Sequence, residues 1–177
     1  MVKKIIIDTD PGVDDSMAIF YALNSPEIEV LGLTTIFGNA STEICTENAL
    51  RLLEIAERTD IPVYKGAEKP LKSEYRGPGD FVHGKDGQGN SDLRPPESTV
   101  QRETAVEYLH NIIKKNPGEI TLVPIGPLTN IAELLLYDKS IANDIKEIVL
   151  IFIKSLYIDE RVSLILFFVT PPCPFLN

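Results

Sequence analysis

Four carboxylates stand within eight positions near the start of the chain, in the segment IIIDTDPGVDD (residues 5–15). Asp8 and Asp10 end an apolar run, and Asp14 and Asp15 follow a Pro-Gly pair. No Lys or Arg lies among these acids. Carboxylates that lie close together raise one another's pKa unless a positive charge compensates them. Because the ligands are all oxygens, calcium or magnesium fits them better than zinc. The segment therefore predicts a cation site.

A purely structural role is the alternative for some of these acids. An acid at the start of a helix stabilises the helix macrodipole and can cap the first turn. That role accounts for Asp14 or Asp15, but not for the pair at the end of a strand. Asp8 and Asp10 are two positions apart, so an extended backbone points them to the same side. We therefore favour the cation site.

The elements that must position these acids alternate between strand and helix. The pattern predicts strands over residues 4–8, 30–37, 61–66, 119–126 and from 145, and helices over 14–24, 41–58, 103–115 and 128–137. Such alternation is typical of an α/β fold with a doubly wound, mostly parallel open sheet of the Rossmann-like kind. Ligands of these folds bind beyond the carboxyl ends of the strands, where the acids stand. In the first helix, the stripe expected to face the core is Met17, Ala18, Tyr21 and Ala22.

Composition limits the class of protein. The 177 residues suffice for one domain with a sizeable core. A net charge of −9 argues against a nucleic-acid partner, because phosphates would be repelled. The apolar run before Asp8 is too short for a secretory signal, and we expect no membrane association. Cys45 and Cys173 make no disulfide framework, which suits a reducing compartment and predicts a cytoplasmic protein.

The last part of the chain has a different character. The charges of residues 151–177 cancel, and the apolar run over residues 162–169 is too short to span a bilayer. We expect residues 1–150 to form the domain. Residues 151–177 are predicted to be an unrelated apolar tail that arose from splicing or from a mispredicted gene junction.

The acidic segment resembles the signature of the nucleoside hydrolases, which cleave the N-glycosidic bond of ribonucleosides. Further stretches match in order: LGLTTIFGN, DFVHGKDGQGN and LVPIGPLTNIA. The resemblance spans residues 3–150, which is far more specific than one short motif. Uridine/inosine-type members, including those of plants, are the most similar. The resemblance implies a ribonucleoside substrate and calcium-dependent hydrolysis to ribose and free base.

The resemblance also implies roles for single residues. Asp10, Asp15 and the backbone carbonyl of Ile125 would bind calcium, and Asp10 would also be the base that deprotonates the attacking water. These roles agree with the physical chemistry, because calcium takes six to eight oxygens and lowers the pKa of a bound water. Asp14 would hydrogen-bond a ribose hydroxyl, and Asp8 would support the turn.

Four further positions carry both a functional and a structural interpretation. Asn39 matches a ribose-contacting Asn of the family, although Gly-Asn is also a common turn. His83 aligns with a histidine near the nucleobase, or is a solvated loop residue. It lies in residues 65–101, whose lack of periodicity predicts a long loop that is either functional or disordered. Thr129 and Asn130 are expected to cap and start a helix rather than to touch substrate.

The resemblance stops after the stretch KEIVL. There the family continues into a Gly-rich turn with ribose-binding Asn and Glu residues, and later a His-Asp pair that completes the calcium shell. This sequence lacks them, so we expect a truncated fold and impaired activity, and we leave open whether the chain forms a family-like homo-oligomer. Two alternatives are a non-catalytic truncated isoform and an aspartyl-phosphate phosphatase with Asp8 as nucleophile and Asp10 as acid/base. The extra acids after Asp10 argue against a phosphatase, because a phosphate must sit there.

Overall fold

The structure is a computed structural model that describes residues 2–75, 77–78 and 80–150. The tail predicted over residues 151–177 lies outside the described residues. The elements are β1 (Lys3–Thr9), α1 (Val13–Leu23), β2 (Ile28–Thr35), α2 (Thr42–Ile55), β3 (Val63–Lys65), α3 (Asp80–His83), α4 (Ala105–Lys115), β4 (Ile120–Pro124), α5 (Thr129–Tyr137), the 3-10 helix η1 (Lys139–Asn143) and β5 (Glu147–Ile148). Every predicted strand and helix is present, and each boundary lies within three residues of its predicted position.

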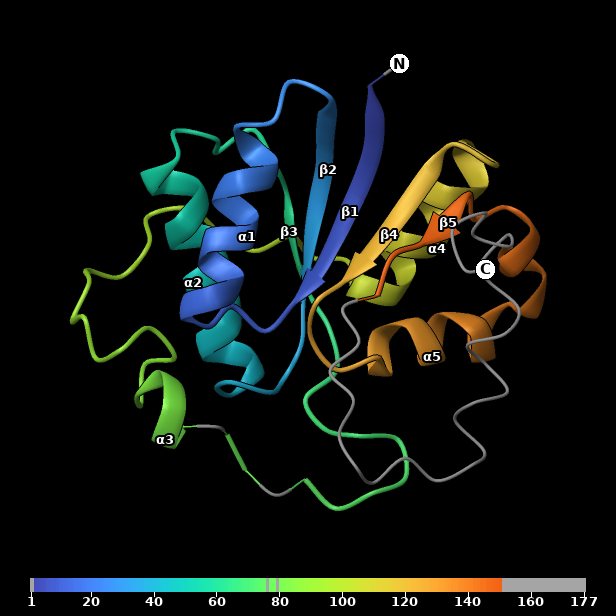
Figure 1. Cartoon of the computed structure of the whole chain (residues 1–177). Helices are drawn as coiled ribbons and strands as arrows, with labels where there is room; N and C mark the ends of the chain where they lie inside the picture. The colour runs from blue at the N-terminus through green and yellow to red at the C-terminus, as the bar shows by residue number, and fades with distance from the viewer. Residues whose placement is uncertain (1, 76, 79, 151–177) are drawn as a thin grey trace, which may run out of the picture.

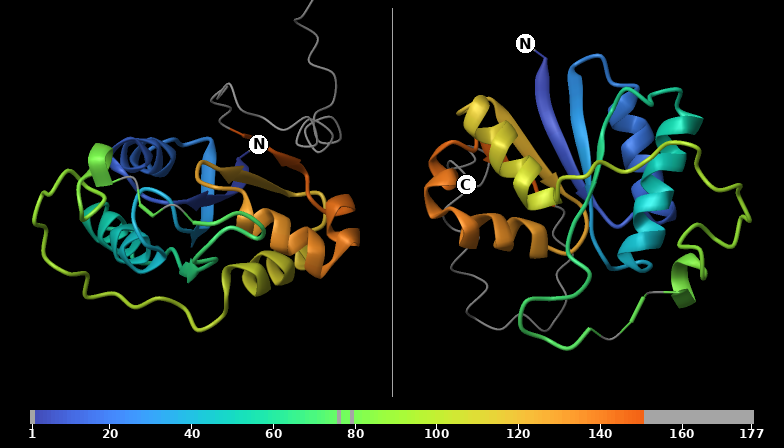
Figure 2. Two further views of the ribbon diagram at one scale, coloured as in Figure 1. Left: turned by 90° about the horizontal axis from the view of Figure 1, so that it is seen from below. Right: turned by 180° about the vertical axis from the view of Figure 1, so that it is seen from behind.

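The strands form one parallel sheet in the order β3-β2-β1-β4-β5. β1 therefore lies at the centre of the sheet, and its carboxyl end points toward the bottom of the view in Figure 1. Helices cover both faces, as Figure 2 shows. The predicted doubly wound α/β fold is confirmed.

Alternation along β1 separates two hydrophobic cores. Ile5 and Ile7 pack with residues of α1 and α2, whereas Ile6 packs on the opposite face with residues of α4 and α5. Successive side chains of a strand point to opposite faces, so an unbroken apolar run is what a strand buried on both faces requires. Because both faces are packed, the end of β1 is held firmly where the acids follow.

The stripe predicted for α1 is only partly right. Ala22 is buried, but Met17 and Tyr21 are 69% and 72% exposed. Ile19 lies against the sheet in their place, together with Asp15 on the same arc of the helix. The helix is apolar on more than one side, so periodicity alone did not identify the side that meets the sheet.

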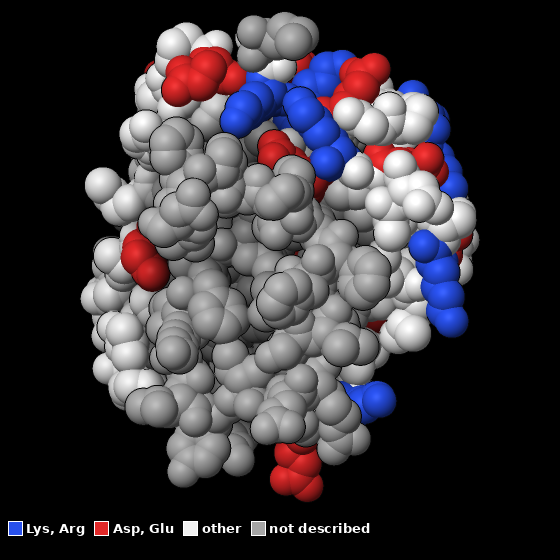
Figure 3. All heavy atoms as spheres, turned by 45° about the vertical axis from the view of Figure 1, so that its right-hand side comes forward, with Lys and Arg blue, Asp and Glu red and all other residues white. Residues whose placement is uncertain are grey.

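An apolar groove runs between α1 and the adjacent strands β4 and β5. It is lined by Ala18, Tyr21, Val123, Ile125 and Val149, among others. Figure 3 shows Lys and Arg side chains gathered with Asp and Glu side chains along the upper edge of one face. Lys4 and Glu119 form an ion pair at 2.8 Å. No helix of the described residues is long and apolar enough to cross a membrane.

Candidate active site

The acidic segment lies where the strand order reverses. From β1 the chain adds β2 and β3 on one side, and then returns to add β4 and β5 on the other. The loops after β1 and β4 therefore diverge from neighbouring strand ends, which is where ligands of open α/β sheets bind. The carbonyl of Asp8 accepts from the backbone N–H groups of Ile125 (2.8 Å) and Gly126 (3.3 Å). The predicted residues Asp10 and Ile125 thus stand at one crevice.

Asn39 joins the two carboxylates predicted to bind the cation. Its backbone N–H donates to Oδ2 of Asp10 at 2.8 Å, and its Nδ2 donates to Oδ2 of Asp15 at 2.8 Å and to the Asp10 carbonyl at 2.9 Å. Asp10 and Asp15 are each 6% exposed. The structure therefore brings Asp10, Asp15 and Asn39 together. Asn39 lies in a turn, and it also donates hydrogen bonds to both acids.

The Asp10 carboxylate occupies space that is open only because two neighbouring residues, Gly38 and Gly126, have no side chain. A Cβ on Gly126 would lie 2.6 Å from Oδ1 of Asp10, and a Cβ on Gly38 would overlap the same carboxylate. Real Cβ atoms do not approach so closely without displacing a neighbour. The carboxylate of Asp10 is thus enclosed by backbone from the ends of β2 and β4.

Burial makes the ionised acids costly in the described structure. Burial, followed by the nearby Asp15 charge, raises the pKa of Asp10 to about 7. Burial also raises the pKa of Asp15 to about 6, although a hydrogen bond from Gly12 N–H to Oδ2 at 3.0 Å acts to lower that pKa. That bond shows that Asp15 also caps α1. Among the described residues, neither acid forms an ion pair with Lys or Arg.

The donor set fits part of the shell of a hard cation. Two uncompensated carboxylates supply oxygen ligands, and the peptide unit of Ile125 stands at the same crevice. Within residues 2–150 as described, no three His, Cys, Asp or Glu side chains gather into a complete metal cluster. Calcium takes six to eight oxygens, so water and substrate would have to supply the others.

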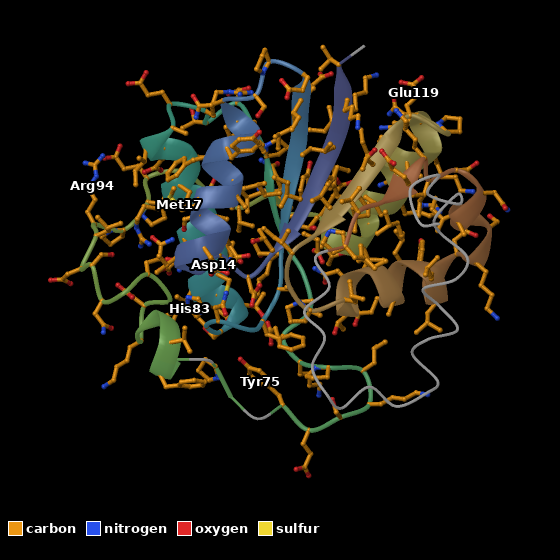
Figure 4. The ribbon with its side chains drawn as sticks, viewed as in Figure 1. Asp14, Met17, Tyr75, His83, Arg94 and Glu119 are labelled. Atoms are coloured by element: carbon orange, nitrogen blue, oxygen red, sulfur yellow. The ribbon has the colours of Figure 1, made fainter. Side chains whose placement is uncertain are left out.

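Asp14 and His83 lie at the mouth of the site. The Asp14 side chain is 83% exposed on the first turn of α1, and its Oδ1 is 3.8 Å from Nδ1 of His83. Figure 4 shows the two side chains close together beneath α1. Val13 N–H donates to the same Nδ1 at 3.4 Å, and only 16% of the His83 side chain is exposed. His83 is thus mostly covered in the short helix α3, and its role near the nucleobase stays a prediction.

The long loop is fixed to the acidic turn by residues that the sequence did not single out. Nδ2 of Asn48, in α2, donates to the carbonyls of Asp86 (2.8 Å) and Pro11 (3.3 Å). Nε2 of Gln88 donates to Oγ of Ser16 at 3.0 Å. Asn48 is 2% exposed. The sequence did contain a signal for Asn48, which is a polar residue among the apolar residues of a helix. Such a residue needs buried hydrogen-bond partners.

Asp8 supports the site from beneath. It is 1% exposed, and its Oδ1 accepts from Oγ1 of Thr34 (2.5 Å) and Nδ2 of Asn130 (2.7 Å). Burial raises its pKa to about 6. An aspartate enclosed in this way has no access to a phosphate, which removes the phosphatase alternative. The capping role expected for Thr129 and Asn130 is also wrong, because Leu128 is the N-cap of α5 and no side chain caps it.

Comparisons with known proteins agree with this geometry. A family model described as "Inosine-uridine preferring nucleoside hydrolase" matches residues 5–151. The chain is 53% identical over 150 residues to "Probable uridine nucleosidase 2" of Arabidopsis thaliana, covering 84% of this chain and 47% of that protein. It is 41% identical over 152 residues to the "Inosine-uridine preferring nucleoside hydrolase" of Leishmania major, covering 85% and 48%.

A solved structure of a plant nucleoside hydrolase superposes with a TM-score of 0.82 at 47% sequence identity, covering 85% of this chain and 48% of that one. The chain therefore spans about half the length of the curated relatives and solved structures that it matches.

Proposed function

We propose that this chain, which belongs to the family of inosine-uridine preferring nucleoside hydrolases, hydrolyses the N-glycosidic bond of ribonucleosides. The substrates would be of the uridine and inosine type, and the products ribose and free base. The observation that carries the proposal is the pair Asp10 and Asp15, buried together at the crevice and joined by Asn39. The relatives named uridine nucleosidase and inosine-uridine preferring nucleoside hydrolase support the substrate class.

Calcium is the cation that we propose for the site. Asp10, Asp15 and the carbonyl of Ile125 would hold it, in agreement with the preference of calcium for oxygen ligands. When bound, the ion would lower the pKa of a water molecule and orient it. The charge of the ion would also relieve the repulsion between the two buried carboxylates.

Asp10 is the proposed base. Its carboxylate accepts the proton of the attacking water, which is the role of a general base. The ribosyl group develops positive charge as the bond to the base breaks. The carboxylates of Asp10 and Asp15 lie where they would stabilise that charge.

Three residues are proposed to position the nucleoside. Asp14, exposed on the first turn of α1, would accept a hydrogen bond from a ribose hydroxyl. Asn39 would contact the ribose from the turn after β2. His83 lies beside Asp14 and would donate a proton to the departing base, a step for which an imidazole is suited near neutral pH. Asp8 would hold the end of β1 in place.

A cytoplasmic location is part of the proposal. Cys45 is free and fully buried, which suits a reducing compartment.

The test is release of uracil from uridine and of hypoxanthine from inosine by residues 1–177 with added calcium, followed by chromatography. Asp10→Asn should lower the rate by about 10²- to 10⁴-fold, the usual contribution of a general base. Asp60→Asn is the matched control, because Asp60 is exposed and pairs only with Arg58 in the described structure. Calcium binding without base release by the unaltered chain would contradict the proposal and favour the non-catalytic alternative.

A further inference from the structure

The side chain of Asn130 lies where the carboxyl ends of three strands meet the start of α5. It is 0% exposed, although it occupies the first turn of a helix. Its Nδ2 donates to Oδ1 of Asp8 at 2.7 Å and to the carbonyl of Thr35 at 3.1 Å. Its Oδ1 accepts from the backbone N–H of Ala67 at 2.8 Å. Both the nitrogen and the oxygen of the Asn130 amide therefore form hydrogen bonds.

These three partners belong to different strand ends. Asp8 is in β1, Thr35 ends β2, and Ala67 follows β3, whereas Asn130 itself comes after β4. The backbone ladder already joins the strands to one another, but only Asn130, among the hydrogen bonds of the described side chains, reaches all three from the β4 side. The amide therefore fixes the four strand ends relative to each other.

The Asn130 amide packs directly against the backbone of Gly66. A Cβ on Gly66 would overlap the amide, and it would also lie 2.5 Å from the carbonyl of Thr35. Buried amides in close contact keep a single orientation, because each lost hydrogen bond would leave an unsatisfied polar group.

The proposed cation ligands follow directly from the strand ends that Asn130 joins. Asp10 is two residues beyond Asp8, and Asn39, which holds Asp10 and Asp15, is four residues beyond Thr35. Ile125 precedes Asn130 by five residues. Partners that orient the ligands of a metal commonly change its affinity about 10- to 100-fold when they are removed.

We propose that Asn130 is a positioning residue of the cation site. Its carboxamide sets the spacing between the loop after β1, which carries Asp10, and the turn after β4, which carries Ile125. This inference rests on one part of the proposed function, which is that the site binds calcium. It concerns a residue that touches neither the ion nor the substrate.

The test measures calcium affinity by calorimetry at neutral pH, on residues 1–177 and three variants, at a temperature where circular dichroism shows each to be folded. Asn130→Ala should weaken binding about 10- to 100-fold. Thr34→Val is the matched control, because Thr34 is equally buried and donates to the same Oδ1 of Asp8. Thr34 is also the direct ladder partner of Asp8, so it joins no further strand, and Thr34→Val should retain affinity within about threefold. Asn116→Ala, whose side chain only bonds Ile112 in α4, should leave affinity unchanged.

Each contrary result has a separate meaning. If the unaltered chain binds no calcium, the proposed cation is wrong and so is the inference. If the unaltered chain binds and Asn130→Ala binds equally well, the inference alone is overturned. Equal losses in Asn130→Ala and Thr34→Val would also overturn it, because the effect would then be that of any hydrogen bond to Asp8.

A measurement on the unaltered chain covers the case in which Asn130→Ala does not fold. The side-chain amide signals of Asn130, followed by ¹⁵N–¹H NMR, should shift when calcium is added, whereas those of Asn116 should not. An unchanged Asn130 signal on saturation with calcium would overturn the inference.

Discussion

The side-chain amide of Asn39 and the carboxylate of Asp15 are joined by a 2.8 Å hydrogen bond, which ties the turn after β2 to the first turn of α1. The backbone N–H of Asn39 holds Asp10 separately. A single residue, which is distant from both acids in sequence, therefore holds the two carboxylates in place relative to each other. Substitution of this side chain affects Asp15 without removing the bond from the backbone to Asp10.

Asn39→Ala should weaken calcium binding about 10-fold, since it frees a ligand from the group that orients it. Terbium luminescence, with calcium as competitor, measures the affinity. Asn24→Ala is the control, because within the described residues the Asn24 side chain bonds only the carbonyl of Phe20, at the far end of α1. Unchanged affinity in Asn39→Ala would show that the hydrogen bond to Asp15 does not order the site.

Stability without calcium should fall as the pH rises from about 5 to 7.5. The pKa values of Asp8, Asp10 and Asp15 are raised to about 6, 7 and 6 by burial, so the folded chain holds protons that the unfolded chain has released above pH 4. When the folded state binds more protons, the free energy of unfolding decreases with pH through that window. The free energy of unfolding should level off once the pH is well above the raised pKa of Asp10.

Urea denaturation in a chelator at pH 5 and pH 7.5 measures this change. Excess calcium should restore stability at pH 7.5 and have little effect at pH 5, where the ligands are protonated. Asp10→Asn should flatten the slope and, in the chelator at pH 7.5, raise the free energy of unfolding by on the order of a few kcal/mol. A slope of the opposite sign would show that the acids are not buried as described.

Gly126→Ala should abolish measurable calcium binding and destabilise the fold by about 1–3 kcal/mol. The new Cβ would meet Oδ1 of Asp10 at 2.6 Å and the Asp10 backbone nitrogen at 3.1 Å, so the carboxylate must move. Calorimetry and urea denaturation measure the two effects. Gly118→Ala separates them, because a Cβ there meets nothing within 4 Å and its only penalty is the positive φ of 72°. Gly118→Ala should lose stability but retain calcium affinity.

Asn48→Ala should release the loop segment that carries Asp86. The variant loses both bonds that hold this segment and the acidic turn to α2. Limited trypsin digestion should then cleave faster after the exposed Lys85, with calcium affinity little changed. Asn111→Ala, which removes only an exposed bond from Nδ2 to Glu103, should be cleaved like the unaltered chain.

The parts of the fold that depend on local pattern could be predicted from the sequence. The apolar run that ends at Asp8 identified a strand buried on both faces, and the Pro-Gly turn before Asp14 identified the helix start. Parallel strands bring their carboxyl ends to one edge, so the alternation of elements predicted that the segments after β1 and β4 would lie side by side, as the hydrogen bond from Ile125 N–H to the Asp8 carbonyl shows.

The parts that depend on distant partners could not be predicted in this way. Asn130 lies 122 positions from Asp8, and in sequence it is indistinguishable from a residue that starts a helix. The side of α1 that meets the sheet was also partly misassigned, because Met17 and Tyr21 have large apolar side chains although they are exposed, whereas Ile19 is buried. The roles of single site residues in binding and catalysis stay predictions, as does the oligomeric state.

The central place of β1 has a consequence for synthesis on the ribosome. β1 is the first strand made, yet one of its two neighbours, β4, pairs Ile120 with Lys4 across most of the chain. At about 5–20 residues per second, β4 emerges roughly 6–23 s after β1. Until then one edge of a strongly apolar strand stays open to pairing with other chains. Nascent chains should therefore need a holding chaperone during this interval, and substitutions in β4 should lower the yield of folded protein more than those in the edge strand β3.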